Sequence, residues 1–357
     1  MGQGEGHRDA PTLRGNSSTA DFFIDGVRDD VQYYRDLYNV ERVEVLKGPN
    51  AMIFGRGGGG GVINRVTKRA GDHTGVSAGF ETGSYDHYRF EGDAGAAIGG
   101  TAAVRLNAMY ENSKGYRRFY VLERYGINPT ASFNLGDATQ IRLNYEYFDD
   151  FRRVDRGIPS QSGRPYRTGR SVFYGNPDLS YMTAAVHLAS VTVEHVFNND
   201  IQLRNHTVFA TYDKFYQNVF ARNAVYAAGN LNLEAYQSGT DRENLFNQTD
   251  LTWTFATGAI GHTFLGGVEA GTQRTKNGRN NSTFNPLISA ASPVSYAPVA
   301  FNVPNQNNKA KVDVVALNVM VGSVVPSPRP TMRMPATSAA IPPAALMVSV
   351  WPGMTTM

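Results

Sequence analysis

The sequence contains no cysteine in 357 residues, which excludes disulfide bonds and thiolate metal sites. It also lacks any run of about 18 apolar residues, so we expect no transmembrane helix. Charged residues are scarce at 18%, and the net charge is only +3, which does not suggest a nucleic-acid-binding protein. These absences still allow a membrane protein, because membrane-spanning strands carry a weak hydropathy signal.

The two ends of the sequence are also unusual. The first residues, MGQGEG, have neither the basic start nor the apolar core of a signal peptide. Either the protein is cytoplasmic or Met1 is not its natural beginning. After Phe301 the sequence has no tyrosine or phenylalanine, and after Asp313 it has no carboxylate. Seven prolines from Pro326 onward interrupt any strand or helix. We therefore expect residues 316–357 to be an aberrant or disordered tail, with a shifted reading frame as the favoured cause.

The composition favours strands and turns. The chain has 37 glycines, 19 tyrosines and 19 phenylalanines, which suits a strand-rich protein with many turns. In residues 1–72, DFFIDGVRD predicts two short strands hinged at Asp25-Gly26, since this dipeptide tolerates positive φ. VERVEVLK predicts another strand, which ends at Lys47-Gly48-Pro49. This region is expected to form a small, turn-rich globular unit.

From about residue 74 onward, apolar and polar residues alternate. In AAVRLNAMYEN, Val104, Leu106 and Tyr110 oppose Arg105 and Glu111. Successive side chains of a strand point to opposite faces, so each such run predicts a strand with one apolar and one polar side. The pattern recurs in HYRFEGDAGAAI, QIRLNYEYF, SVTVEHVF and DLTWTFA. We expect about nine strands between residues 74 and 272, and a tenth from near residue 312.

Short and long connections alternate between these strands, as they do in an outer-membrane barrel. The polar faces suit a lumen that is filled by water or by a plug. A soluble antiparallel sheet with one solvated side is the alternative. Tyr110 and Tyr147 fit an interfacial aromatic girdle and ordinary strand aromatics equally well. Tight turns are expected at residues 99–100, 136–137, 198–200 and 258–261, and long loops at about 113–126, 150–187, 213–246 and 273–310.

The glycine-rich stretch FGRGGGGGVINRVTK admits three interpretations. Gly55, Gly57 and Gly60 match G-x-G-x-x-G, but a dinucleotide site needs a helix after the glycines. VINRVTK is β-branched and predicts a strand instead. A free linker is also disfavoured, because strand-like runs hold both ends. The remaining interpretation is close packing, since glycine lets the backbone pass within contact distance of a neighbour.

At these residues the sequence resembles the second half of the plug of TonB-dependent siderophore receptors. The matching elements are IDGVRD, VERVEVLKGP and FGRGxxGGVIN followed by Thr-Lys, with a weaker likeness to about residue 272. The resemblance implies a mostly β fold: residues 1–72 as the C-terminal half of an α+β plug, and residues 73–315 as about 9–10 of 22 strands of an antiparallel transmembrane barrel. The chain then looks truncated at both ends. The motif residues are Lys47, Gly48, Pro49, Gly55, Arg56, Gly57, Gly60 and Gly61.

The resemblance further implies uptake of ferric siderophore across the outer membrane, with the TonB complex and membrane lipid as partners. A catecholate ligand is anionic and aromatic, so its site would use Arg for charge and Tyr or Phe for stacking. Arg56 is expected to pair with Glu91 or Asp93 of the barrel wall rather than with ligand. Ordinary packing is the competing interpretation for each candidate ligand residue: Arg28, Gln32, Tyr33, Tyr34, Arg35, Arg117, Arg118, Phe119, Tyr120, Phe215, Tyr216, Phe220 and Arg222.

The sequence offers no catalytic arrangement. Its seven histidines are scattered, and there is no H-E-x-x-H motif, nucleophile elbow or calcium loop. Asp149 and Asp150 are adjacent on a predicted strand and so face opposite ways. We therefore expect no catalytic residues, no metal site and no cofactor, with iron present only in the ligand. The alternatives are a receptor for another bulky nutrient, such as cobalamin or a glycan, and an adhesion barrel that uses its outer loops.

Overall fold

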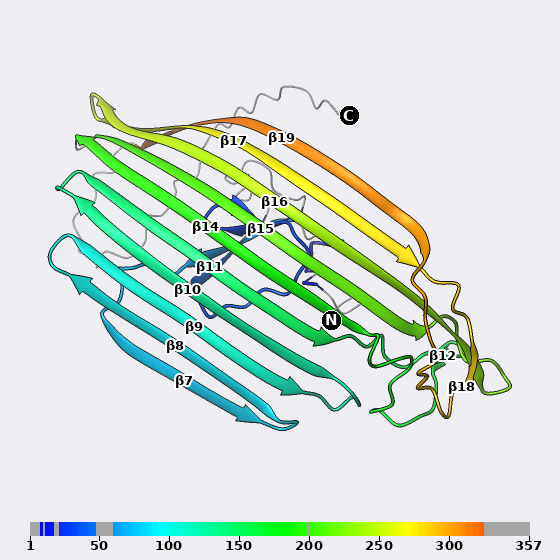
Figure 1. Cartoon of the computed structure of the whole chain (residues 1–357). Helices are drawn as coiled ribbons and strands as arrows, with labels where there is room; N and C mark the ends of the chain where they lie inside the picture. Colours follow the sequence, from blue (N-terminus) through cyan, green and yellow to red (C-terminus); the bar gives the residue numbers. More distant parts are fainter. Residues whose placement is uncertain (1–7, 10, 18–20, 48–59, 199, 325–357) are drawn as a thin grey trace.

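The computed structural model describes residues 8–9, 11–17, 21–47, 60–198 and 200–324. Two bodies make up this part: a large curved sheet and a small N-terminal unit, which lies within the curve of the sheet (Figure 1). The described residues contain strands, and no helix among them is long and apolar enough to cross a membrane. The α part of the expected α+β plug is therefore not seen in the described residues.

Ten long strands form the continuous path of the large sheet, in which every neighbouring pair is antiparallel, and the short β18 (Leu287–Ser289) pairs with β16 as its eleventh strand. Each strand lies beside the strand that precedes it among these ten, so the sheet is a meander (Figure 1). The strands are β7 (Gly75–Gly83), β8 (His87–Ile98), β9 (Ala102–Lys114), β10 (Val121–Leu135), β11 (Thr139–Arg153), β14 (Tyr181–Asn198), β15 (Ile201–Ala221), β16 (Asn230–Thr257), β17 (Ile260–Asn281) and β19 (Val303–Val324).

From β8 onward the connections alternate in length as expected, but the long ones are shorter than the sequence pattern predicted; β7 and β8 are joined by residues 84–86 only. Residues 115–120, 154–180, 222–229 and 282–302 make these connections. The predicted loop 213–246 is mostly occupied by β15 and β16, because paired strands keep their ladder of hydrogen bonds after the apolar pattern ends. Similarly, β19 begins before residue 312 and continues past residue 315 to Val324. The long connections also hold the short strands β12 (Ser160–Gln161), β13 (Arg164–Pro165) and β18 (Leu287–Ser289).

The two faces of the sheet differ in polarity in the way that the alternation predicted. On β9 the side chains of Val104, Leu106 and Tyr110 are about 40% exposed. Their neighbours Arg105 and Glu111 are buried on the opposite face, against the N-terminal unit. The apolar face is therefore the outer one, and the polar face encloses the N-terminal unit.

Aromatic rings gather on the outer face near both ends of the strands. Near the long connections, Tyr110 pairs in register with Tyr125, and the Tyr125 ring centroid lies 5.8 Å from that of Tyr147. Near the tight turns, the ring centroids of Trp253 and Phe255 are 4.5 Å apart. Aromatic rings favour the boundary between hydrocarbon and water. The arrangement fits the interfacial girdle better than scattered strand aromatics.

The N-terminal unit contains a four-stranded sheet in the order β4-β3-β6-β5. The predicted hinge lies between β3 and β4, where Asp25 and Gly26 have φ of 48° and 91°. VINRVTK forms a strand, as expected, so no helix follows the glycines to hold a phosphate. The strands are β1 (Thr12–Leu13), β2 (Asn16–Ser17), β3 (Phe22–Ile24), β4 (Val27–Arg28), β5 (Val40–Leu46) and β6 (Val62–Thr67).

The two described glycines of the glycine-rich stretch are sites of close packing. A Cβ atom at Gly60 would lie 2.9 Å from the Cβ of Leu13 and closer still to the Leu13 carbonyl oxygen. At Gly61, φ is +143° and a Cβ atom would lie 2.5 Å from the carbonyl oxygen of Leu46. Only glycine fits both demands without a backbone shift. Gly55 and Gly57 lie outside the described residues.

We expect Gly60→Ala to lower the free energy of unfolding of the N-terminal unit by about 1–3 kcal/mol, the usual range for overpacking. The added methyl group must displace the backbone of Leu13, which cannot rotate away. Urea unfolding followed by limited proteolysis measures the change. Gly92→Ala is the control, because nothing lies within 4 Å of a Cβ atom there. Equal effects of the two substitutions would contradict the packing role.

Candidate functional site

A buried cluster around Asp29 joins the N-terminal unit to the sheet. The Asp29 carboxylate accepts hydrogen bonds from Arg35 Nε at 2.9 Å and from an Arg65 guanidinium nitrogen at 2.7 Å. The hydroxyls of Tyr33 and Tyr212 donate to it at 3.0 and 3.1 Å. Tyr212 lies on β15 of the sheet, and Asp29 is fully buried. The carboxylate is thus paired with two cations within an interior that excludes water.

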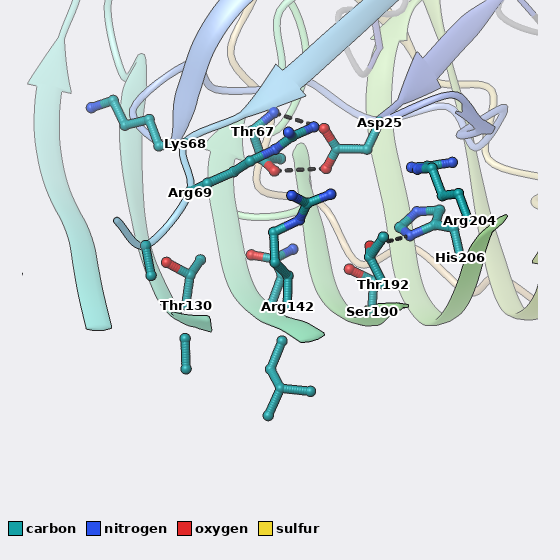
Figure 2. Close-up of a pocket in the computed structure, with 14 residues that line it drawn as sticks. Asp25, Thr67, Lys68, Arg69, Thr130, Arg142, Ser190, Thr192, Arg204 and His206 are labelled. Carbon is teal, nitrogen blue, oxygen red and sulfur yellow. Dashed lines mark hydrogen bonds between the residues drawn. The ribbon is translucent and has the colours of Figure 1, made fainter. Parts of the chain in front are cut away.

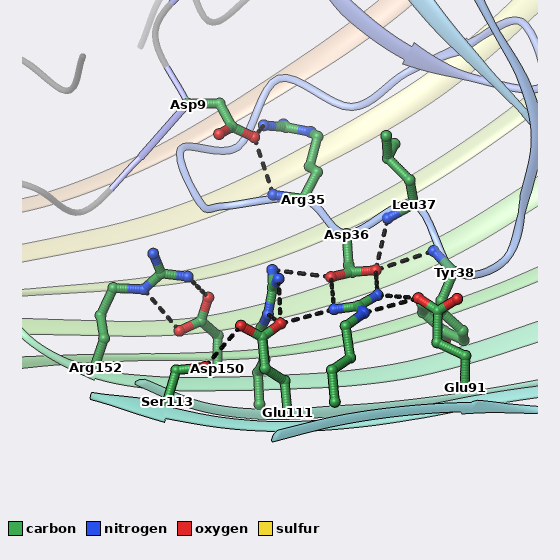
Figure 3. A network of polar contacts seen from close by, with 12 residues as sticks. Asp9, Arg35, Asp36, Leu37, Tyr38, Glu91, Glu111, Ser113, Asp150 and Arg152 are labelled. Atoms are coloured by element: carbon green, nitrogen blue, oxygen red, sulfur yellow. Dashed lines mark hydrogen bonds and ion pairs between the residues drawn. The ribbon is translucent and has the colours of Figure 1, made fainter. Parts of the chain in front are cut away.

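A second cluster surrounds Asp36 of the N-terminal unit (Figure 3). Arg89 of β8 donates to both Asp36 carboxylate oxygens, at 2.8 and 3.0 Å. Arg124 of β10 lies 2.9 Å from the same carboxylate. Both arginines also contact Glu111 of β9, at 2.7 and 2.6 Å. Two strands of the sheet therefore bind one carboxylate of the N-terminal unit, and Glu111 on the strand between them binds both arginines.

Further polar contacts spread the attachment around the sheet. Arg242 of β16 lies 2.9 Å from the Asp30 carboxylate. Lys214 of β15 donates to the backbone carbonyl of Gln32 at 2.7 Å. Lys68, just after β6, lies 3.2 Å from Asp93 of β8. The N-terminal unit is therefore held by charge pairs along much of the curve, together with a shared apolar cluster of buried side chains from both bodies.

The two anchoring carboxylates stay ionised at neutral pH. Burial alone would raise the pKa of Asp29, but the charges of Arg35 and Arg65 outweigh it and hold that pKa below its ordinary value. Burial likewise opposes ionisation of Asp36, and Arg89 and Arg124 hold its pKa below the ordinary value. Each carboxylate therefore binds its proton less readily in the folded state than in the unfolded state.

These lowered pKa values predict acid release of the N-terminal unit. A carboxylate with a depressed folded-state pKa stabilises the fold above its unfolded pKa of about 3.9, and this stability is lost as the pH falls through the lower folded value. We expect resistance to protease to be level from about pH 5 to 7 and to fall below about pH 4. Limited proteolysis across this range measures it. A midpoint near pH 6 would point to histidine instead of these carboxylates.

A small cavity lined by polar side chains lies at the opposite, tight-turn end of the interface (Figure 2). Its volume is about 30 Å³, which accommodates only a few water molecules. Arg69 from the N-terminal unit and Arg142, Arg204 and His206 from the sheet line it, and Asp25 accepts hydrogen bonds from Thr67 at its edge. The cavity is too small for a bulky ligand, so we assign it to the interface between the two bodies.

Near the long connections, two arginines lie over aromatic rings of the inner face. The Arg156 guanidinium carbon is 3.5 Å from the centroid of the Phe220 ring, and Arg156 donates to the Tyr236 hydroxyl at 2.8 Å and to the Tyr216 hydroxyl at 3.3 Å. The Arg279 guanidinium carbon is 3.7 Å from the Tyr236 ring centroid. We call these five residues the arginine–aromatic cluster. The rings are buried, whereas both arginines are half-buried.

A smaller arrangement of the same kind lies where the N-terminal unit meets β11. The Arg152 guanidinium carbon is 3.9 Å from the centroid of the Tyr34 ring. Arg152 also forms a buried ion pair with Asp150 of the same strand (Figure 3). Tyr34 is half-buried, and burial raises the pKa of its hydroxyl. The phenol is therefore neutral at physiological pH and presents an aromatic edge.

The five candidate ligand residues within DGVRDDVQYYRD lie in different surroundings. Tyr33 and Arg35 lie inside the Asp29 cluster, and the Arg35 side chain is only 2% exposed. Arg35 also donates to the carbonyls of Asp29, Val31 and Tyr33, contacts that lie within the N-terminal unit; ligand contact at Tyr33 and Arg35 stays a prediction. Gln32 accepts a hydrogen bond from Arg8 at 2.7 Å, and Arg28 lies 5.8 Å from the Phe23 ring centroid. Tyr34 is the candidate with a half-exposed ring beside a sheet arginine.

The candidates at 117–120 do lie in a connection, between β9 and β10. Arg117 forms a bidentate ion pair with Asp155, at 2.6 and 2.9 Å. This contact joins two of the long connections. Phe119 contacts Phe173 edge-on at 5.8 Å. Arg118 is exposed and Tyr120 half-buried. Ligand contact at these four positions stays a prediction.

The third candidate group is divided by strand alternation. Phe215 and Tyr216 are consecutive on β15, so Phe215 lies on the outer face and Tyr216 on the inner face. Arg222 follows the strand, is exposed, and lies 3.7 Å from Glu234. Tyr216 and Phe220, which also belongs to the candidate group, are both part of the arginine–aromatic cluster. Arg156, Tyr236 and Arg279 were missed, because they are distant in sequence and only strand register brings them together.

The predicted contact of Arg56 with the sheet lies outside the described residues, as do Gly48 and Pro49. The carboxylates expected to receive Arg56 have other partners: Asp93 binds Arg105 at 2.7 Å and Lys68, and Glu91 binds Arg89. Lys47 is exposed at the end of β5.

A meandering antiparallel sheet that has an apolar outer face and curves around a small unit held by charge pairs is the architecture of part of a plugged outer-membrane barrel. Residues 1–62 match the model of the TonB-dependent receptor plug domain. The catecholate siderophore receptor Fiu of Escherichia coli is 33% identical over 304 residues, which cover 78% of this chain and 39% of that protein. The chain belongs to the TonB-dependent siderophore receptor family, whose members lie in the outer membrane.

Solved structures agree with this assignment. The open form of the ferric-catecholate import receptor Fiu from Escherichia coli K12 superposes with a TM-score of 0.77 at 28% identity, over 88% of this chain and 52% of that one. The siderophore receptor PiuA from Acinetobacter baumannii gives a TM-score of 0.79 over 90% of this chain and 50% of that one; at 24% identity it supports the fold alone. The N-terminal unit is thus part of the plug, and the large sheet is part of the barrel wall. The chain spans 39% of the length of the Fiu sequence it matches.

Proposed function

We propose that this chain is the plug-bearing part of a receptor that takes up ferric siderophore of the catecholate type, in a TonB-dependent manner. The arginine–aromatic cluster is the observation that carries the proposal. Deprotonated catecholates carry negative charge on flat rings. The guanidinium of a half-buried arginine can pair with that charge and stack on the ring. The likeness to catecholate receptors supports the same ligand class.

The proposed mechanism consists of binding and movement, with no covalent step and no cofactor. Ligand binds among the long connections and the outward end of the plug, where Tyr34, Arg156 and Arg279 lie. The carboxylates Asp29 and Asp36 keep the plug seated while the site is empty. Force applied through TonB then has to break the charge pairs between the plug and the barrel wall before a path for the ligand opens through the barrel. Iron travels as part of the ligand.

Growth under iron limitation tests the proposal. A strain deprived of its own catecholate receptors is given the receptor gene that carries this chain, and one ferric siderophore is supplied at a time. We expect rescue by ferric catecholates, loss of rescue without TonB, and no rescue by a ferric hydroxamate. Uptake of cobalamin or a glycan instead, or cell adhesion without any uptake, would replace the proposal with those functions.

A further inference from the structure

Three arginines from two bodies line the small cavity at the tight-turn end of the interface (Figure 2). Arg69 follows β6 of the plug, whereas Arg142 lies on β11 and Arg204 on β15 of the wall. Figure 2 shows the Arg69 side chain reaching toward Arg142 across the interface. Arg204 is repelled by both of these arginines. Like charges are therefore gathered where the plug meets the wall.

The carboxylates of the wall neutralise these charges by sharing. Glu194 pairs with both Arg142 and Arg204, and its distance to Arg204 Nε is 3.5 Å. Asp250 adds a longer contact with Arg204, at 3.8 Å. Neither Glu194 nor Asp250 is among the residues that line the cavity. Both carboxylates thus hold the wall arginines from behind, and the cavity side of the guanidinium groups is left to another acceptor.

The charges that the plug contributes are not paired with each other. Asp25 lines the cavity, but its two carboxylate oxygens accept hydrogen bonds from Thr67, at 2.9 and 2.6 Å. Lys68 lies 3.2 Å from Asp93 of the wall. Among the residues that the structure describes, Arg69 forms no ion pair. Arg69 is therefore the cation of this cavity that lacks a counter-charge.

Two buried nitrogen atoms of the cavity lining also have no hydrogen-bond partner among the described residues: His206 Nε2 and Asn144 Nδ2. The His206 side chain is almost fully buried, at 2% exposure, and its Nδ1 lies 2.8 Å from the Thr192 hydroxyl. The Asn144 carbonyl oxygen accepts from Asn128 at 2.6 Å, which directs the NH₂ group away from Asn128. An amide NH₂ and a guanidinium only donate, and a buried donor without an acceptor costs free energy. The lining therefore matches an occupant that accepts hydrogen bonds and carries negative charge.

We propose that this cavity binds one small inorganic anion of halide size, with chloride as the physiological ion. The cavity volume of about 30 Å³ admits an ion about as large as a water molecule and excludes a siderophore. The anion supplies the counter-charge of Arg69 and links it to Arg142 and Arg204. Since release of the plug separates Arg69 from the wall, anion binding stabilises the seated plug by mass action. This site is separate from the arginine–aromatic cluster and does not depend on which nutrient the receptor carries.

Salt exchange at constant ionic strength tests the site in the purified receptor. Thermal unfolding of the plug is followed in sodium gluconate, sodium chloride and sodium bromide, because gluconate is too large for the cavity. We expect a higher unfolding temperature in chloride and bromide, with an effect that saturates as the halide concentration rises. Crystals of the receptor grown in bromide should show an anomalous scattering peak in the cavity.

Arg69→Gln is the decisive variant, because it removes a cation without leaving a carboxylate unpaired. The halide concentration that gives half of the effect should rise about tenfold, as for the loss of a charge-assisted contact. In gluconate the variant should be as stable as the unmodified receptor or more stable, since repulsion between the arginines is relieved. His206→Phe keeps a ring but removes the buried donor, and a smaller rise is expected.

Arg14→Gln is the matched control. Arg14 is an exposed arginine of the plug that does not line the cavity. Among the described residues it forms no ion pair, as is the case for Arg69. The control should keep the halide dependence of the unmodified receptor.

Four results would overturn the proposal. The unmodified receptor could unfold at the same temperature in all three salts, or Arg69→Gln could keep the full halide effect. Arg14→Gln could weaken the effect as much as Arg69→Gln, which would reduce it to net charge. A bromide peak without any effect in solution would mean an adventitious ion only. Siderophore uptake is measured separately by growth, so its failure would leave each of these results unchanged.

Discussion

Replacing Asp29 by asparagine should destabilise the seated plug by about 3–5 kcal/mol, the range for removing one partner of a buried ion pair. The substitution keeps the shape of the side chain but leaves Arg35 and Arg65 as charges in an interior where the Asp29 side chain is 1% exposed. It also weakens the bond from Tyr212 of the wall, which joins the two bodies. Urea unfolding of the plug measures the loss, and cells should become permeable to bulky antibiotics that a seated plug excludes.

Asp9→Asn is the matched control for this prediction. Asp9 lies 3.8 Å from the same Arg35, but its side chain is 29% exposed. Its contact with the backbone N–H of Arg35, at 2.9 Å, is one that asparagine can keep. We expect a change of about 1 kcal/mol or less, as for solvent-screened pairs. Equal losses from the two substitutions would mean that burial does not set the strength of these contacts.

The faces of the strands could be predicted from the sequence, because alternation is local. Arg105 and Glu111 were expected on a polar inner face, and they lie there, buried against the plug. Their partners could not be predicted. Tyr212 meets Asp29 across 183 residues of sequence, and strand order together with the seating of the plug decides that contact. Periodicity gives the direction of a side chain, and only the assembled fold gives the group that it meets.

The candidate ligand site was only partly predictable, for the same reason. The sequence predicted Arg beside Tyr or Phe, and Arg156 does donate a hydrogen bond to the Tyr216 hydroxyl at 3.3 Å. Sequence proximity, however, grouped Phe215 with Tyr216, although consecutive residues of a strand face opposite ways. The sequence predicted a loop at 213–246, where strand alternation would not apply. The strands instead continue well past the apolar rows. The residues that complete the cluster come from β16, β17 and the connection before β14.

Arg156→Ala should weaken the binding of a ferric catecholate by about tenfold to a hundredfold, as expected when a charge-assisted contact of about 1.5–3 kcal/mol is lost. Arg156 donates to the hydroxyls of Tyr216 and Tyr236, and its guanidinium carbon lies 3.5 Å from the Phe220 ring centroid, so the guanidinium is held in place before ligand arrives. Tyr236→Phe keeps the ring but removes the stronger of the two bonds, and a smaller loss is expected. Quenching of intrinsic fluorescence by the ferric ligand measures the affinity.

Arg222→Ala controls for charge at the same end of the strands. Arg222 is exposed and lies 3.7 Å from Glu234, outside the arginine–aromatic cluster. Its loss should change affinity by less than about twofold, since exposed pairs are weak. The unfolding temperature of each variant separates lost ligand contact from a collapsed connection, because Arg156 also holds residues 154–180 against β15 and β16. If Arg156→Ala binds ligand as the unmodified receptor does while remaining folded, the cluster only supports the loops, and the ligand site must be sought around Tyr34 and Arg152.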